Sequence, residues 1–132
     1  MFILYAVLVG LIVGFVAGGR LTALGELRIR WAPLILVGLL TQVVLFSDAV
    51  AERIGSLGPP LYVASTLLAV AAILRNITIP GFPLVAVGAA SNMAAIVANG
   101  GFMPASPAAL AALGKDTPTI YSNSSVVPNP AL

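Results

Sequence analysis

The segment Pro33–Gln42, PLILVGLLTQ, returns fifty residues later as Pro83–Asn92, PLVAVGAASN. Both segments begin with Pro-Leu, carry Val-Gly in the middle and end on a polar pair after an otherwise apolar run. Proline is tolerated in the first turn of a helix, where its missing N–H costs no hydrogen bond. The two segments are therefore predicted to begin two similar apolar helices, related either by duplication or by a chance match.

One face of each predicted helix carries a glycine followed four residues later by an amide, Gly38 with Gln42 and Gly88 with Asn92. Apolar helices in lipid associate by close approach at small residues and by hydrogen bonds between polar side chains. These four residues therefore predict helix packing, with Gln42 and Asn92 meeting between the two helices. The alternative is that the two amides line a polar pocket for a substrate, quinone or ion.

The composition is typical of an integral membrane protein. The 132 residues are 60% hydrophobic and 8% charged, and the mean hydropathy is +1.10. A soluble domain of this size would expose apolar surface that aggregates. The chain has no cysteine and no histidine, so thiolate chemistry, a structural zinc site and a histidine base are excluded, and no cofactor or metal is expected. The net charge of +2 is too small to indicate a nucleic-acid-binding surface.

Four apolar segments approach the roughly 20 residues that cross a bilayer as a helix. No Lys, Arg, Asp or Glu lies inside them. The four predicted spans are residues 2–19, 31–46, 59–74 and 82–98. The sequence thus predicts an all-α protein with a four-helix transmembrane domain over residues 1–98, built as two tandem helical hairpins, and an extracytoplasmic region over residues 99–132.

The distribution of basic residues predicts the orientation in the membrane. The side that carries more Lys and Arg next to the spans faces the cytoplasm. Four arginines fall on one side and two basic residues on the other, namely Arg20, Arg28, Arg30 and Arg75 against Arg53 and Lys115. Both termini are then expected outside the cytoplasm, in a multi-pass protein of the inner membrane.

The first span carries Gly10, Gly14 and Gly18 at four-residue intervals, a glycine zipper of two overlapping GxxxG motifs. A face of this kind lets another backbone approach closely, so it predicts contact with a neighbouring span or with another protein. The span lacks the basic start of a signal peptide and exceeds the 7–15 apolar residues of one. A retained helix is therefore expected, with cleavage as the alternative.

After the fourth span the chain is predicted to turn at Asn99-Gly100-Gly101. Ser106 then suits a helix N-cap, Pro107 the first helical position and Gly114 the stop, which predicts a short helix on the outer membrane face. The residues beyond it are rich in Ser, Asn and Pro and are expected to be extended or disordered unless a partner orders them.

The strings GGR after the first span and ANGGFMPASPAAL after the fourth resemble domain-of-unknown-function family 5317, a family of small bacterial membrane proteins. The residues that carry the resemblance are Gly18, Gly19, Arg20, Asn99, Gly100, Gly101, Met103, Pro104 and Ser106. The similarity is expected over the whole chain, although members are usually longer and carry a further apolar helix. It implies a polytopic fold in the bacterial inner membrane and implies no chemistry.

The function expected from these features is that of a non-catalytic accessory subunit in a larger membrane complex, such as a respiratory or photosynthetic assembly. An enzyme needs an acid, base, nucleophile or metal in a protected site, and the charged residues all lie outside the spans. The expected partners are the lipid bilayer and other membrane subunits, with a lipid, quinone or pigment in a helix groove left open. The alternative is a small oligomeric transporter or facilitator for a neutral or lipidic solute.

Overall fold

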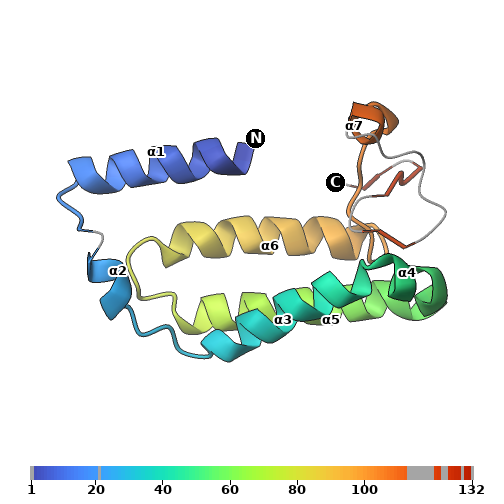
Figure 1. The fold of residues 1–132 in the computed structure, drawn as a ribbon, viewed down its shortest axis with the longest axis horizontal. Coiled ribbons are helices and arrows are strands. Elements are labelled where there is room, and N and C mark those ends of the chain that lie inside the picture. The colour runs from blue at the N-terminus through green and yellow to red at the C-terminus, as the bar shows by residue number, and fades with distance from the viewer. Residues whose placement is uncertain (1, 21, 113–120, 123–124, 129, 132) are drawn as a thin grey trace.

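The computed structural model of the chain describes residues 2–20, 22–112, 121–122, 125–128 and 130–131. Every regular element in these residues is a helix, and one isolated parallel bridge joins Pro104 to Ser125. The elements are α1 (Phe2–Val16), α2 (Thr22–Glu26), α3 (Ala32–Leu45), α4 (Asp48–Ile54), the 3-10 turn η1 (Gly55–Leu57), α5 (Gly58–Arg75), α6 (Phe82–Ala98) and α7 (Pro107–Ala112) (Figure 1). The expected all-α class is therefore confirmed for the described residues.

Three of the helices form the body of the molecule. The central helix α5 packs against α3 on one side and α6 on the other, and each neighbour runs antiparallel to it (Figure 1). All three begin with proline in the first turn, as the sequence predicts for α3 and α6. The second to fourth expected spans therefore coincide with α3, α5 and α6 to within one residue at each end.

One helical run is long and apolar enough to cross a membrane, judged by length and composition. It comprises α4, η1 and α5 over Asp48–Arg75, 28 residues in all. The other apolar helices among the described residues are shorter, covering Val7–Val16, Ala32–Leu45 and Phe82–Ala98.

The most buried apolar cluster lies at one end of the three-helix body. Leu45 from the end of α3, Tyr62 from the start of α5 and Ile96 from the end of α6 form it, and Ile96 is fully buried. These positions meet because α5 is antiparallel to both neighbours. Met103 and Tyr121 from the segment after α6 pack against the same cluster. The core is therefore closed by the C-terminal part of the chain.

The first helix stands apart from this body (Figure 1). Every α1 side chain whose burial the structure describes is exposed. The helix ends at Val16, three residues before the end of the expected span, because Gly18 adopts a left-handed conformation with φ of 82°. The short helix α2 that follows was not anticipated from the sequence.

Candidate helix-packing interface

Two helices of the body approach each other closely at Gly38 of α3. A Cβ atom added there would lie 2.6 Å from the carbonyl oxygen of Ser65 on α5, a separation that real Cβ contacts do not reach. The absence of a side chain is therefore what lets the two backbones approach. This is the helix-packing role that the sequence predicts for Gly38, with α5 as the neighbour.

The polar residue of the same face, Gln42, also contacts α5. Its Nε2 donates a hydrogen bond of 3.3 Å to Oγ1 of Thr66, and that hydroxyl donates in turn to the carbonyl of Tyr62 at 2.9 Å. Ser65, one residue earlier, donates to the same carbonyl at 2.9 Å. Sequence reasoning did not single out Ser65 or Thr66. The signal that could have found them is two adjacent hydroxyl residues in the middle of an apolar span.

The corresponding residues of α6 are placed differently. A Cβ added at Gly88 would meet nothing within 4 Å, and Asn92 is exposed. The helix instead buries Ala86 and Ile96 against the body. Gln42 bonds to Thr66 of α5 while Asn92 is exposed, so the two amides do not form the expected pair within the described chain.

The glycines of α1 are open as well. A Cβ at Gly10 or Gly14 would meet nothing within 4 Å. Gly18, expected on the same helical face, lies beyond the end of α1 instead. The amide of Gly18 donates to Phe15 at 2.9 Å and that of Gly19 to Gly14 at 2.8 Å, the pattern of a Schellman cap. Gly18 and Gly19 thus end the helix, and Gly10 and Gly14 alone share its glycine face.

The end of α6 repeats this geometry at Asn99-Gly100-Gly101. The amide of Gly100 donates to Val97 at 3.1 Å and that of Gly101 to Ile96 at 2.8 Å, with φ values of 68° and 89° at the two glycines. Gly101 also lies against Pro59 at the start of α5, where a side chain would clash with the ring. The double glycine therefore both caps α6 and lets the chain pass over α5.

The rest of the family-like string folds the chain back over the body. Met103 accepts a hydrogen bond from the amide of Ser125 at 3.0 Å, and Pro104 forms the isolated bridge with the same residue. Ser106 caps α7 as predicted, because its Oγ accepts the amide of Ala109 at 3.1 Å. The proposed helix stop at Gly114 lies outside the described residues.

Tyr121 and Asn99 fasten the returning segment. The Tyr121 hydroxyl donates to the Gly101 carbonyl at 2.6 Å, and its ring stacks on Phe46 with centroids 5.8 Å apart. Asn99 accepts the amide of Ala131 at 3.0 Å. Burial, reinforced by nearby Tyr62, raises the pKa of Tyr121 to about 12. The described part of the tail is thus held by specific contacts within the chain, which sequence reasoning did not anticipate.

The opposite end of the body is fastened by Asn76, which directly follows α5. Its Oδ1 accepts the Arg30 amide at 2.8 Å, while its Nδ2 donates to the carbonyls of Arg30 and Ala72, each at 2.7 Å. The side chain is 2% exposed, so these bonds satisfy a buried amide. Sequence reasoning missed Asn76. An asparagine just after the last residue of a helix, as at Asn99, is the signal that could have found it.

Among the described residues, no group of three or more Asp, Glu, His or Cys side chains could hold a metal ion. No buried side-chain nitrogen or oxygen in this part of the chain lacks a hydrogen-bond partner. The polar groups that are buried, such as Ser65, Thr66, Asn76 and Asn99, are therefore occupied in holding helices and loops together. The features of the described chain that remain available to other molecules are its open helix faces and its exposed charged side chains.

The comparison with known families matches residues 26–128 to the model of a family of unknown function, DUF5317. The matched range contains α3 to α7 and the string from Asn99 to Ser106, while Gly18, Gly19 and Arg20 lie before it. No curated protein and no solved structure matches the chain. The resemblance read from the sequence is confirmed, and this chain belongs to the family of unknown function DUF5317.

Proposed function

We propose that this chain is a non-catalytic accessory subunit of a larger assembly in the bacterial inner membrane. In this proposal α1, α3, α5 and α6 each cross the bilayer, and α1 together with the outer face of α6 packs against helices of other subunits. The observation that carries the proposal is that these two surfaces are apolar, contain glycines open to close approach, and are unused within the described chain.

The exposed apolar surface supports a membrane environment. Val16 of α1 is 85% exposed, and Leu84 and Val87 of α6 are 80% and 66% exposed. Apolar side chains are spread over the outside of every long helix, and none of these helices carries a charge before its last residue. Water disfavours such a surface, whereas acyl chains and neighbouring apolar helices do not.

The helices are slightly shorter than the hydrocarbon core of a typical bilayer, so the proposal requires a locally thin membrane or apolar residues that extend the helix ends. The 18 residues of α5 span about 27 Å, and the 14 residues of α3 span about 21 Å, against a hydrocarbon core of about 30 Å. Trp31 and Phe46 bracket α3 with further apolar length. Short spans are accommodated by bilayer thinning or by association with other helices, and the second route agrees with an assembly subunit.

The predicted orientation is retained in the proposal. Arg28, Arg30 and Arg75 lie at the end of the body where α3 begins and α5 finishes, while Asp48, Glu52 and Arg53 lie on α4 at the other end (Figure 1). The positive-inside rule then puts the three arginines in the cytoplasm and both termini outside it.

The open glycines supply the packing argument. Gly38 shows that this sequence pattern brings two backbones together when a helix is available, and Gly88 presents the same pattern with no helix against it. Gly10 and Gly14 do the same on α1. Association in lipid depends on such close approach, so a partner helix at either face would gain dispersion contacts that lipid provides less well.

The test is purification of the native chain in a mild detergent, with the mass of the complex, the identity of co-purified proteins and the absorption spectrum measured together. A stoichiometric complex with cofactor-bearing subunits is the expected result. The variant Gly88→Leu should dissociate it while keeping the helix content, and Gly14→Leu tests α1 in the same way. The control is Ala64→Leu, which introduces the same leucine side chain at an exposed site on α5.

Two outcomes contradict the proposal. Recovery of the chain alone or as a homo-oligomer, without other subunits, removes the accessory role. Equal loss of the complex with Gly88→Leu and Ala64→Leu would show that general bulk, and not the glycine face of α6, accounts for the effect.

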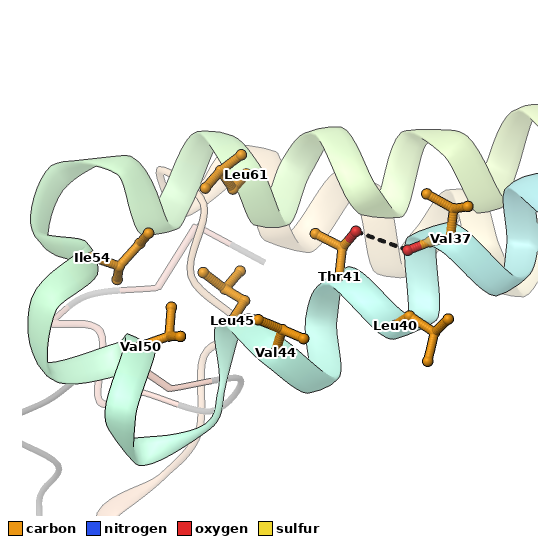
Figure 2. Close-up of a pocket in the computed structure, with 8 residues that line it drawn as sticks. All are labelled: Val37, Leu40, Thr41, Val44, Leu45, Val50, Ile54 and Leu61. Atoms are coloured by element: carbon orange, nitrogen blue, oxygen red, sulfur yellow. Dashed lines mark hydrogen bonds between the residues drawn. The ribbon is translucent and has the colours of Figure 1, made fainter.

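A second candidate function is favoured by one groove. This groove, of about 470 Å³, lies between α3, α4 and the start of α5 and is lined by Val37, Leu40, Thr41, Val44, Leu45, Val50, Ile54 and Leu61 (Figure 2). Thr41 is the only polar side chain among the described lining residues, and its hydroxyl already donates to the Val37 carbonyl at 2.8 Å. A surface with no free donor suits an acyl or isoprenoid chain, as a facilitator for a lipidic solute would require.

A substitution in the groove distinguishes the two proposed functions. Leu61→Trp should fill the opening and abolish movement of a fluorescent phospholipid across proteoliposomes if the chain is a facilitator, while Leu67→Trp on an exposed part of α5 should not. If the chain is an accessory subunit, neither the parent chain nor either variant should move the phospholipid.

A further inference from the structure

The end of the body where α3 begins and α5 finishes carries most of the positive charge of the chain. Arg20, Arg28, Arg30 and Arg75 belong to the segments at this end, against the single acidic residue Glu26. All four arginines are exposed. The other end has Asp48, Glu52 and Arg53 on α4, and the Arg53 guanidinium donates a hydrogen bond to the Ala49 carbonyl of its own helix. The two ends therefore differ in sign.

Two of these arginines are held in place by the fold. The three hydrogen bonds of the buried Asn76 side chain fix the backbone of Arg30 against the end of α5, whose last residue is Arg75. The Arg75 guanidinium carbon lies 5.9 Å from the centroid of the Trp31 ring, within the range of a cation–π contact. Arg30, Trp31 and Arg75 thus form one fixed group joined through Asn76.

The charges of this group are not neutralised within the described chain. No described carboxylate forms an ion pair with Arg28, Arg30 or Arg75. The first residue of α3, Ala32, follows Trp31 directly, so the positive end of the α3 dipole faces the same region. The exposed Arg75 guanidinium beside the exposed Trp31, with exposed Arg28 and Arg30 just before that tryptophan in the chain, matches the chemistry of an anionic headgroup at the membrane interface.

We propose that Arg28, Arg30, Trp31 and Arg75 form a binding site for the phosphate headgroup of an anionic phospholipid in the cytoplasmic leaflet. The site rests on the membrane placement proposed above, and it is independent of the accessory role. The guanidinium groups donate to phosphate oxygens, and Trp31 positions Arg75 and lies at headgroup level. A site of this kind anchors the cytoplasmic end of α3 and α5 in a fixed register with the bilayer surface.

The first measurement is lipid binding by the purified full chain in a neutral maltoside detergent. Phosphatidylglycerol and phosphatidylcholine with the same acyl chains are added separately, and bound lipid is counted by native mass spectrometry while thermal unfolding is followed. Phosphatidylglycerol should bind at least about 25-fold more tightly and raise the unfolding midpoint, because each arginine near an anionic surface contributes about fivefold in affinity. This preference should weaken as salt is raised.

Arginine variants test whether phosphatidylglycerol binds at the proposed site. Arg30→Gln with Arg75→Gln should lower phosphatidylglycerol affinity by about 25-fold, the product of two such factors, and leave phosphatidylcholine binding unchanged. Arg53→Gln, at the other end, is the matched control and should change neither. Arg28→Gln gives the same readout without touching the Trp31 contact, so it tests the site even where the double variant does not fold.

The results that overturn the site are equal affinity for the two lipids, or an effect of Arg53→Gln as large as that of the double variant. Competition by sn-glycerol 3-phosphate or inorganic phosphate at the same concentration as the lipid also overturns it, because the occupant would then be a soluble anion. Extraction of the native membrane with alkaline carbonate separates the two proposals. If the chain is released, the membrane placement fails; if it is retained without a lipid preference, only the lipid site fails.

Discussion

The two related segments of the chain, Pro33–Gln42 in α3 and Pro83–Asn92 in α6, use the same residues in different ways. Gly38 is pressed against the Ser65 carbonyl of α5, whereas Gly88 has nothing within 4 Å of where its Cβ would be. The two helices are rotated differently about their own axes. In α6 the buried residue is Ala86, which lies about 200° around the helix from Gly88 at 3.6 residues per turn. A glycine pattern therefore provides a capacity for close approach, and the neighbours of the helix decide whether it is used.

The largest expected difference in stability is between the alanine variants of Gly38 and Gly88. Gly38→Ala places a methyl group 2.6 Å from a backbone oxygen that cannot rotate away, so α3 and α5 must separate, at a cost of about 2–3 kcal/mol of unfolding free energy. Gly88→Ala meets no atom and relieves the low helix propensity of glycine, so it should be neutral or stabilising by up to about 1 kcal/mol. Unfolding of the detergent-solubilised chain, followed by circular dichroism, measures both.

The comparison fails if the two alanine variants behave alike. Equal destabilisation would mean that Gly88 is already packed against another helix in the purified chain, which its oligomeric state would reveal. Equal tolerance would mean that α3 and α5 are less closely packed at Gly38 than the structure shows.

Helix positions followed from the sequence more reliably than helix neighbours. Pro33 and Pro83 mark the first turns of α3 and α6, and the uncharged runs between charged residues set their lengths, so these helices could be located from local features alone. The rotation of a helix about its axis depends on all the side chains that it packs against. For that reason the partner of Gln42, Thr66, and the exposure of Asn92 could not be predicted from the glycine and amide pattern.

The segments that follow the two related helices meet at Tyr121. Its ring stacks on Phe46, just after α3, and its hydroxyl donates to Gly101, just after α6. Tyr121→Phe keeps the ring and removes the hydrogen bond, leaving the Gly101 carbonyl without this donor, so we expect a loss of about 1–1.5 kcal/mol. Thermal unfolding of the variant beside the parent chain measures this loss, and an unchanged midpoint would show that the hydroxyl is solvated instead.

The same contact predicts a response to alkaline pH. The pKa of Tyr121 is raised from 10.0 to about 12, chiefly by burial. A group whose pKa is higher in the folded state favours folding fully below its unfolded pKa, and this contribution disappears as pH rises through the folded value. Stability should therefore decline between pH of about 10 and 12, more in the parent chain than in Tyr121→Phe. An identical decline in both would assign it to other groups.

The string from Asn99 to Ser106 shows what a recognisable motif can and cannot predict. Its glycines indicated a turn and Ser106 a helix cap, and both are present because left-handed backbone and N-capping depend on the residue itself. The return of the chain to Tyr121 and Ser125 depends on contacts twenty residues away, which no local pattern encodes. The tail, expected from its composition to be extended or disordered unless a partner orders it, is in its described part held to the body by contacts within the chain.

A smaller difference is expected at the two amides. Gln42→Leu removes the 3.3 Å bond to Thr66, whose hydroxyl keeps its own bond to Tyr62, so the cost should be about 0.6 kcal/mol, the average for side-chain hydrogen bonds between membrane helices. Asn92→Leu should leave the isolated chain unchanged. If Asn92 bonds to a partner helix, it should instead weaken the native complex. Unfolding in detergent and the mass of the complex report these two effects separately, and a cost for Asn92→Leu in the isolated chain would place that amide inside the fold.

The smallest effects should come from the hydroxyl residues beside the amides, where the two segments do behave alike. Thr41 donates to the Val37 carbonyl at 2.8 Å and Ser91 to the Val87 carbonyl at 2.9 Å, each four residues back in its own helix. Such a bond is local and does not depend on the neighbouring helix, so Thr41→Val and Ser91→Ala should each change the unfolding free energy by less than about 0.5 kcal/mol. A cost above about 1 kcal/mol at Ser91 alone would mean that its hydroxyl contacts another helix, and the outer face of α6 would then be covered already in the purified chain.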